Sequence, residues 1–481
     1  MRTTDRQPNK ALRAARSGMT QGALADQVNA EIYRATGEVT VITAKSISDW
    51  ERGWYTWPSA DVRAALCRIL GASDPEELGF YKRRTVRGLP ELHPVVLSDL
   101  IESRGVIPAE ASRAIELQAG RSFSGAELML HHCVAEASGR GWLMIELTDQ
   151  LSASLRRTDR WNAIVTSDAD GKYYVSDGRR FAPRRGRHAN RQPVASAHVI
   201  DELTTGIIWA VVNTDTALLA DDAQLEISQM RLAHYVEQPV SEASMSEVPD
   251  LNPVAGQWLG STFCSRHISA HLGRLSEAPF FWTREQCGEE AANWLLWNHK
   301  LEYLRSTSKR FTGIRRAFCV PEQEVETSPR YERVLLLLTM ALMEAFGITV
   351  ELTADPAAGE VGGFVLADGA IEANWLGGDR IWRVDARPRP ERQSTYRDIA
   401  RRLEVESVIA CERSAGRLEA MADYLGISWS WFRRRCEELA AAGIDGIAQP
   451  RSRHLSTRGL DTAIRYIAHI NTIEGVCLAR C

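Results

Sequence analysis

Three side chains with metal-binding chemistry lie close together in the middle of the chain. Cys264, His267 and His271 stand at positions i, i+3 and i+7, so a helix would place one thiol and two imidazoles on a single face. A metal site of this kind needs a fourth ligand, and the neighbouring sequence offers none. Three such residues on a helix are more often buried packing residues, and we predict no metal site.

A second group could act in acid–base catalysis. Glu285, Glu289 and Glu290 would lie on nearby faces of a helix, although helices commonly carry exposed glutamates that do no chemistry. The chain lacks the G-x-x-x-x-G-K-[ST] phosphate loop, the H-E-x-x-H zinc motif, the G-x-S-x-G nucleophile motif and a dinucleotide-binding fingerprint. We therefore expect a protein that is not an enzyme and that uses no cofactor.

Aromatic residues gather in the same central region. Aromatic walls with a few polar groups are typical of small-molecule pockets, although a packed core is the commoner reason for such a cluster. This cluster is where we predict an effector site, and its members are Trp282, Trp294 and Trp297 with Phe280, Phe281, Arg284 and His299.

Basic residues are concentrated at the two ends of the chain. The net charge of the whole chain is −4, yet residues 1–90 hold 14 Lys and Arg against 10 Asp and Glu, and residues 387–481 hold 16 against 12. The centre is correspondingly acidic. Basic ends around an acidic centre favour nucleic-acid contacts at the ends and another role between them.

The apolar residues near the N-terminus recur at the three- and four-residue spacing of helices. Thr20 is placed to cap one helix, Thr43 or Ser46 to cap the next, and Gly53 to end it. The pattern predicts three short helices around one small core, which would contain Leu12, Ala15, Leu24, Ala25, Val28, Ile47 and Trp50.

Three motifs in this region resemble the Cro/repressor (Xre-type) family of helix-turn-helix transcriptional regulators, of the actinobacterial type. They are LRAAR at 12–16, TQGALA at 20–25 and SISDWERG at 46–53. The resemblance implies an all-α, lambda-repressor-like domain whose second motif helix enters the major groove, and an ion pair between Arg16 and Glu51. The connection at 29–42 is longer than the usual turn, which leaves the register of the second helix open by about one turn.

The residue types on these helices indicate how DNA would be contacted. Gln21 begins the first motif helix, where a backbone amide and the helix dipole favour a phosphate oxygen. The second motif helix would read base edges and phosphates. The predicted DNA-binding residues of this region are Gln21, Thr43, Lys45, Ser46, Ser48, Asp49 and Arg52.

A second candidate follows the Pro- and Arg-rich segment 387–393. Residues 418–447 pattern as two helices around a turn at Gly426 and resemble the helix-turn-helix of transposase-related and homeodomain-like proteins, including a basic tail at 449–454. An Arg-rich exposed helix in a dimerising domain is the alternative. Under the first interpretation Ser428, Trp429 and Ser430 begin the groove helix, and Arg433, Arg434 and Arg435 contact phosphates.

Between the two ends the pattern alternates helices and strands. We predict a hairpin at 161–178, an apolar helix pair at 198–222, and a β-α-β-β-β order at 315–385 with a turn at Asp368 and Gly369. The fold class is multi-domain and mainly α with an α+β centre. The predicted domains are 1–88 (N-terminal helix-turn-helix), 89–240 (mixed α/β), 241–386 (helical plus α+β, sensor-like) and 394–475 (C-terminal helical).

Composition adds expectations about location and partners. The N-terminal segment is polar, no apolar run has the length of a membrane span, and nine scattered cysteines suggest reduced thiols, so we expect a cytoplasmic protein without membrane contact. The expected function is a sequence-specific transcriptional regulator that binds double-stranded DNA as a homodimer and responds to a small-molecule or protein effector. The alternatives are a transposase- or mobile-element-related DNA binder and a sensor or adaptor that binds no DNA.

Overall fold

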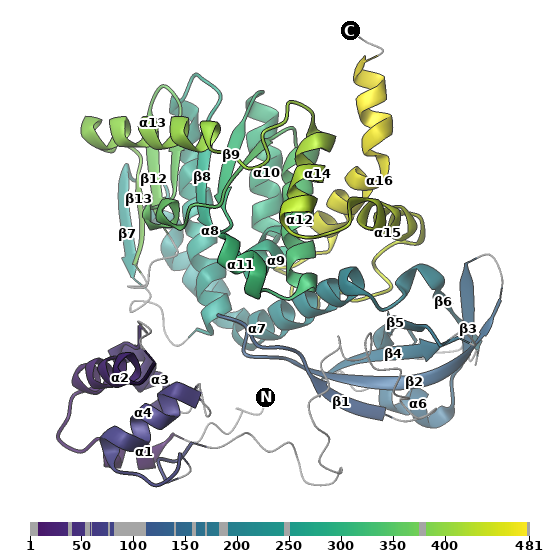
Figure 1. The fold of residues 1–481 in the computed structure, drawn as a ribbon, viewed down its shortest axis with the longest axis horizontal. Helices are drawn as coiled ribbons and strands as arrows, with labels where there is room; N and C mark the ends of the chain where they lie inside the picture. The colour runs from purple at the N-terminus through teal and green to yellow at the C-terminus, as the bar shows by residue number, and fades with distance from the viewer. Residues whose placement is uncertain are drawn as a thin grey trace. The chain divides into compact units, whose positions relative to one another are not determined.

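The computed structural model divides the chain into two compact units, residues 1–93 and 94–481 (Figure 1). The structure describes residues 8–36, 41–52, 58, 60–75, 77–80, 112–138, 141–155, 160–168, 171–181, 191–244, 251–374 and 381–478.

The first unit is helical. Its helices are α1 (Lys10–Ala15), α2 (Gln21–Thr36), α3 (Ala44–Glu51) and α4 (Ala60–Leu70). They share one small core, to which α4 and the segment after it add apolar side chains beyond the predicted set. The prediction is wrong for Ala15, which is exposed on α1. The buried members of this core are Leu12, Leu24, Ala25, Val28, Ile32, Ile47, Trp50, Val62, Ala65, Leu66, Leu78 and Phe80.

The caps predicted for this unit are confirmed. The Thr20 hydroxyl accepts a hydrogen bond from the backbone N–H of Ala23, and the Thr43 and Ser46 hydroxyls bond each other's backbone N–H groups at the start of α3. Gly53, predicted to end α3, lies outside the described residues.

The predicted long connection between α2 and α3 is largely helix. Helix α2 continues through Thr36, because Ile32 follows Val28 by four residues and extends the buried stripe. The Asn29 side chain then holds the chain as it approaches α3. Its Oδ1 accepts from the backbone N–H of Ile42 at 2.7 Å, and its Nδ2 donates to the carbonyl of Ile42 at 2.8 Å.

The second unit contains two sheets. In the first, strand order is β5-β4-β2-β3-β6, with β1 paired to β2. The long strand β2 is parallel to β4 and antiparallel to β3, and the predicted hairpin is confirmed as β4 and β5. The strands are β1 (Ser112–Glu116), β2 (Glu127–Ala137), β3 (Trp142–Glu146), β4 (Trp161–Ser167), β5 (Tyr173–Asp177) and β6 (Arg191–Ala195); α6 (Asp149–Leu155) precedes β4.

The second sheet has the order β10-β9-β8-β11-β12-β13-β7. Strands β8, β9 and β10 are parallel and joined by helices, whereas the pairs from β8 through β7 are antiparallel. The predicted β-α-β-β-β order at 315–385 is one strand short, because residues 362–385 contain three strands, β11, β12 and β13, where the prediction allows two. The strands are β7 (Val240–Ser244), β8 (Phe280–Glu285), β9 (Arg315–Cys319), β10 (Thr349–Thr353), β11 (Phe364–Leu366), β12 (Ala370–Asn374) and β13 (Ile381–Asp385).

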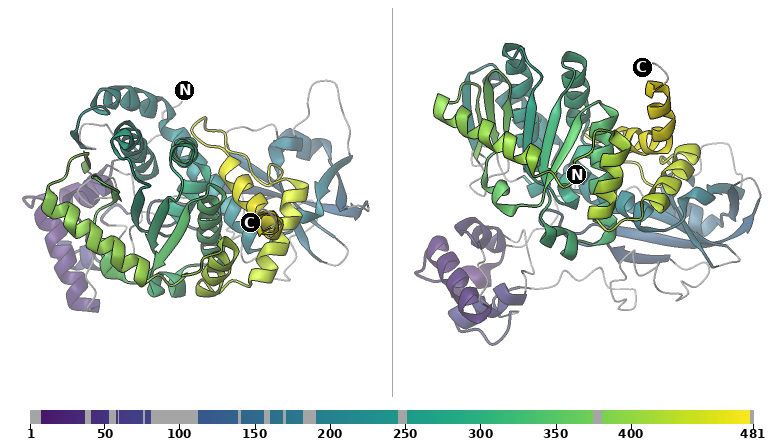
Figure 2. Two further views of the ribbon diagram at one scale, coloured as in Figure 1. Left: turned by 90° about the horizontal axis from the view of Figure 1, so that it is seen from above. Right: turned by 45° about the horizontal axis from the view of Figure 1, so that its top comes forward.

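Helices cover both faces of the second sheet. One face packs on α13 (Pro390–Val405) through Phe280, Trp282 and Phe364, and Figure 2 shows this helix crossing the strands. Alternate strand residues such as Phe281 and Val365 belong to the main core, as the two-residue period of a strand requires. That core includes α8 (Pro253–His271), α9 (Gly288–Leu296), α10 (Asn298–Arg310) and α12 (Arg330–Ala345), and the short α11 (Glu322–Thr327) precedes α12.

The predicted helix pair at 198–222 is wrong. The segment belongs to a single helix, α7 (Glu202–Leu232), capped by Asp201. Neither proline nor glycine follows Gly206 within this helix, so nothing in the sequence interrupts it. In the described part of the chain it is the one helix long and apolar enough to cross a membrane, but 78% of its apolar window is buried inside the protein, as in a core helix.

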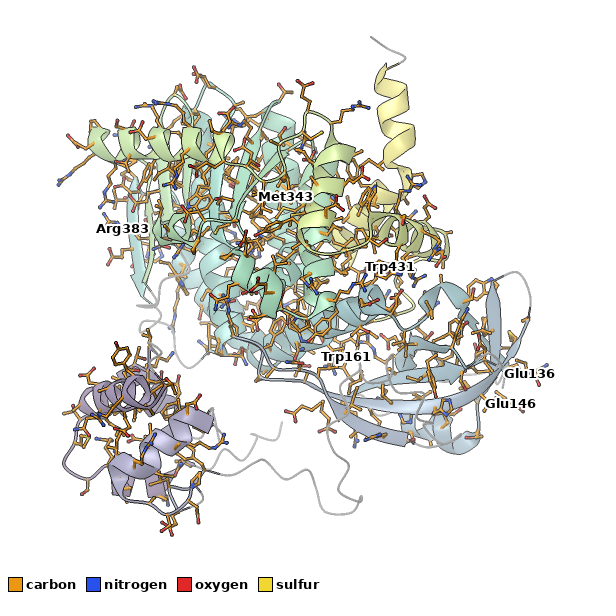
Figure 3. The ribbon with its side chains drawn as sticks, in the orientation of Figure 1. Glu136, Glu146, Trp161, Met343, Arg383 and Trp431 are labelled. Atoms are coloured by element: carbon orange, nitrogen blue, oxygen red, sulfur yellow. The ribbon has the colours of Figure 1, made fainter. Side chains whose placement is uncertain are left out.

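The C-terminal helices belong to the same core as the centre. They are α14 (Ser414–Tyr424), α15 (Trp429–Ala442) and α16 (Arg458–Leu478). One hydrophobic cluster contains residues from Ile115 to Ile470, so the divisions predicted at 240 and 386 fall within a continuous packed interior. Figure 3 shows Met343 inside this interior and Glu136 and Glu146 at the outer end of the first sheet.

Candidate functional site

The residues predicted to read DNA bases share one face of α3. Lys45, Ser48, Asp49 and Arg52 stand at i, i+3, i+4 and i+7, while Ile47 and Trp50 are buried on the other side. Arg52, just after the helix, is exposed and the other three are half-buried. The four polar side chains therefore form a continuous surface supported by a packed apolar face.

Glu51 fixes the position of this helix. Its carboxylate accepts from Nε of Arg16 at 2.6 Å and from Nε2 of Gln21 at 2.8 Å. The ion pair implied by the family resemblance is thus confirmed. Gln21, predicted to meet a phosphate, instead uses its side-chain amide to join the start of α2 to α3. The hydroxyls of Thr43 and Ser46 are also engaged, in the cap of α3.

The C-terminal residues predicted to bind DNA differ in accessibility. Ser428 and Ser430 are exposed at the start of α15, where the Ser428 hydroxyl accepts from the backbone N–H of Trp431. Trp429 is half-buried, Arg433 pairs with Glu437 at 3.5 Å and Arg434 is exposed. The Arg435 side chain is only 4% exposed and forms ion pairs with Asp201 and Glu438.

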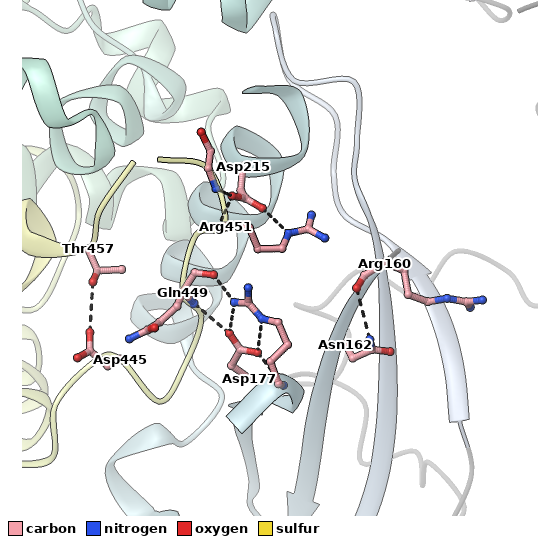
Figure 4. A network of polar contacts seen from close by, with 10 residues as sticks. Arg160, Asn162, Asp177, Asp215, Asp445, Gln449, Arg451 and Thr457 are labelled. Atoms are coloured by element: carbon pink, nitrogen blue, oxygen red, sulfur yellow. Dashed lines mark hydrogen bonds and ion pairs between the residues drawn. The ribbon is translucent and has the colours of Figure 1, made fainter. Parts of the chain in front are cut away.

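The basic tail at 449–454 forms hydrogen bonds and ion pairs with acidic residues of the same unit. Asp215 on α7, whose side chain is fully buried, accepts from the backbone N–H of Ser452 and from Nε of Arg451 at 2.8 Å (Figure 4). Arg453 pairs with Glu226 on the same helix, and Asp177 accepts from the backbone N–H of Gln449. The acidic side chains of the centre neutralise a tail that looks like a phosphate contact in the sequence.

The central residues singled out for metal or acid–base chemistry have separate partners. His267 bonds Ser241, His271 bonds the carbonyl of Gln238, and Cys264 is buried against the carbonyl of Asn374. Burial, followed by the charge of His271, lowers the pKa of His267 to about 4. Among the residues that the structure describes, no three His, Cys, Asp or Glu side chains are grouped to hold a metal.

The glutamates have structural contacts as well. Glu289 is buried, which raises the pKa of its carboxyl, and it accepts from the backbone N–H groups of Ser122 and Phe123. Glu290 accepts from the backbone N–H of Cys287 at the start of α9. The prediction of three glutamates on one helix is wrong, because Glu285 is the last residue of strand β8 and the helix begins only at Gly288. The side chain of Glu285 is outside the described part of the structure.

The predicted aromatic cluster does border a cavity. Phe281, Trp282 and Trp294 line it, but Phe280 packs under α13 and His299 is buried against Ser261. Sequence reasoning missed the two cations in the wall, Lys300 and Arg316. The available signal was position. Lys300 stands on the helix stripe of Trp297 and Leu304, and Arg316 alternates with Ile314 and Phe318 on the buried face of its strand.

Comparisons with known proteins found no similarity that identifies the chain. No protein-family model matches it, and neither a curated protein nor a solved structure matches it.

Proposed function

We propose that the protein is a sequence-specific DNA-binding transcriptional regulator whose N-terminal unit is a helix-turn-helix domain. The observation that carries the proposal is the polar face of α3 formed by Lys45, Ser48, Asp49 and Arg52, fixed by the Arg16–Glu51–Gln21 contacts. A short helix held rigidly with polar residues at this spacing suits insertion in a major groove.

The roles of the individual residues follow from their contacts. We assign base and phosphate contacts to Lys45, Ser48, Asp49 and Arg52. Thr43 and Ser46 hold the start of α3, where exposed backbone amides favour a phosphate, and Gln21 supports the helix from behind.

At the C-terminus we propose a secondary contact through Ser428, Trp429, Ser430, Arg433 and Arg434. Their positions at the start of α15 and on its accessible side support this contact. Arg435 and the basic tail are left out, because both are neutralised by acidic side chains. We further propose a homodimer in the cytoplasm, since one such module contacts too few base pairs for specificity in a genome. We propose neither catalysis nor a cofactor.

The test is selection of duplexes from a random library by the full-length protein, followed by affinity measurement at several salt concentrations. The wild type should enrich one sequence motif, and its affinity should fall steeply with salt. Lys45→Ala with Arg52→Ala should lose the motif. The matched control is Arg34→Ala with Arg68→Ala, which removes two positive charges from α2 and α4 of the same unit and should retain it.

A third variant addresses the C-terminal residues. Arg433→Ala with Arg434→Ala should keep the motif while lowering the salt slope by about 1 for each phosphate that is no longer neutralised. An unchanged slope would remove α15 from the interface. If the intact protein enriches no duplex, the adaptor interpretation replaces the regulator.

A further inference from the structure

A cavity in the second unit lies between the second sheet and the helices that cover it. Strands β8, β9, β11 and β12 form one wall and α8, α9 and α10 the other. The space between them is about 440 Å³ when the part open to solvent is included, and about 30 Å³ of it admits the centre of a water molecule. Most of the lining is aromatic or aliphatic, which is the usual character of a small-molecule site. The apolar lining includes Ile268, Phe281, Trp282, Trp294, Phe364 and Val365.

Two buried cations face this cavity. Arg316 is 3% exposed and Lys300 is 5% exposed, and neither forms a salt bridge with a carboxylate in the described part of the chain. Aromatic rings hold them instead. Nζ of Lys300 lies 4.2 Å from the ring centre of Trp294, and the Arg316 guanidinium lies 4.5 Å from that of Phe281. Two positive charges buried without a salt bridge are unfavourable, so the wall favours a negatively charged occupant.

The hydrogen bonds of Arg316 define the shape of that occupant. Nη1 donates to the Thr283 hydroxyl at 2.8 Å, and the Tyr303 side chain lies close enough to the guanidinium to oppose the lowering of its pKa by burial. Nε and Nη2 themselves have no partner with hydrogen-bond geometry among the described residues. Nε and Nη2 form one planar edge of the guanidinium. This edge presents two parallel N–H groups at the spacing of the two oxygens of a carboxylate.

The backbone beside the cavity is irregular. Strand β8 has a bulge between Trp282 and Glu285, and Arg284 adopts a φ of 71°, the one positive value of a non-glycine residue in the described chain. Bulges and left-handed residues are enriched near binding sites because they redirect side chains there.

We propose that this cavity binds a small organic carboxylate with an apolar body. The carboxylate pairs with the Nε and Nη2 edge of Arg316, and the apolar body packs against Phe281, Trp282 and Trp294. Lys300 supplies a second positive charge when it is protonated. The proposal concerns ligand binding to the second unit and goes beyond DNA binding, on which it does not rest.

The experiment compares charged and neutral probes on the full-length protein. Acetate, benzoate, phenylacetate and indole-3-acetate are added in turn, with benzamide as the neutral match to benzoate, and inorganic phosphate as an anion without an apolar body. Thermal unfolding and tryptophan fluorescence report binding, since Trp294 lies in the wall. At least one aromatic carboxylate should raise the Tm and change the fluorescence, whereas benzamide and phosphate should not.

Variants assign the effect to the cavity. Arg316→Met should fold, because an apolar replacement of similar size for a buried charge is often neutral or stabilising, and it should weaken carboxylate binding by about tenfold or more. Lys300→Met should weaken it as well and serves if Arg316→Met does not fold. The control is Arg305→Met on α10, whose side chain is 42% exposed.

Three results would overturn the proposal. They are no response to any of the four carboxylates, an equal response to benzoate and benzamide, and a response that persists in both Arg316→Met and Lys300→Met. A phosphate response that depends on Arg316 would replace the carboxylate with an inorganic anion.

Discussion

The buried cations of this protein fall into two groups, those that form an ion pair with a carboxylate and those that do not. Arg417 on α14 binds Glu344 of α12 through two nitrogens at 2.7 Å, and Arg435 is paired with Asp201. Such buried cations stabilise the contact between helices because the acid offsets the loss of water. Lys300 and Arg316 form no ion pair of this kind within the described part of the chain, which is why they are the candidates for function rather than packing.

Lys300 should make stability depend on pH. Burial, with Arg316 adding to it and Glu290 opposing it, lowers the pKa of Lys300 from 10.5 to about 7. Below pH 7 Lys300 is protonated in both the folded and the unfolded chain. The folded protein then carries the full free-energy cost of burying the ammonium group. Between about pH 7 and 10.5 only the unfolded chain keeps it, so the free energy of unfolding rises by about 1.4 kcal/mol per pH unit.

Urea denaturation at a series of pH values checks this expectation without added ligand. The difference in the free energy of unfolding between Lys300→Met and the wild type should be largest at and below pH 7. It should shrink as the pH rises. Lys309→Met, an exposed position on the same helix, should show no such trend. Parallel curves for wild type and Lys300→Met would contradict the depressed pKa.

The contact between Arg16 and Glu51 should be a large contribution to the stability of the first unit. Glu51 is 7% exposed at its side chain and Arg16 18%, so Arg16→Met leaves a nearly buried carboxylate bonded only to Gln21. We expect a loss of about 2–4 kcal/mol in the free energy of unfolding, with much of it restored in Arg16→Met with Glu51→Leu. A double-mutant cycle by chemical denaturation measures the coupling, and independent effects of the two changes would refute it.

At the scale of elements, the positions of helices depend on a few side chains that bridge them. Helix α2 runs well past the point where the family pattern places the turn, and the chain must then return to begin α3 at Ala44. Asn29 supplies both a donor and an acceptor to Ile42, so a single amide orders the approach to α3.

Asn29→Ala should therefore loosen α3 relative to α2. Loss of two hydrogen bonds to the backbone predicts a decrease of about 1–3 kcal/mol in the free energy of unfolding, and faster amide exchange at 42–52. Hydrogen exchange with mass spectrometry measures both the loss of stability and the faster exchange at 42–52. Gln27→Ala, at an exposed position on a different face of α2, is the control and should leave the exchange of α3 unchanged. Equal exchange in the two variants would show that Asn29 does not order the connection.

At the scale of the whole molecule, the first unit has a small helical core and the second unit a much larger interior. The C-terminal helices share that interior, and Asp215 of α7 fastens the segment leading to α16. The C-terminal region is therefore part of the cooperative structure of the second unit.

Calorimetry should resolve this organisation. Two transitions are expected, one for each unit, and Asp215→Ala should lower only that of the second unit, by several degrees, because it leaves the Arg451 guanidinium and two backbone N–H groups without their acceptor. Asp222→Ala, at a more exposed position on the same helix, should have a smaller effect. A separate third transition for the C-terminal helices would contradict a shared core.

Local patterns in the sequence were enough to predict much of the structure. The caps at Thr43 and Ser428, the turn at Gly426 and the hairpin at 161–178 follow from short-range chemistry that acts within a few residues. The predicted mixture of helices and sheets is confirmed for the same reason. The length of α7 was missed because an interrupted apolar pattern does not by itself end a helix.

Tertiary structure decided what the charged residues do. Nothing in RRRCEEL separates Arg435 from Arg434, yet packing of α15 buries one beside Asp201 and leaves the other exposed. Asp215 and Arg451 are more than two hundred residues apart, and Lys300 and Arg316 meet only because α10 lies over β9. Burial and charge pairing depend on neighbours from distant parts of the chain, so the sequence alone determines which side chains can bind an anion, and only the fold determines which remain available to do so.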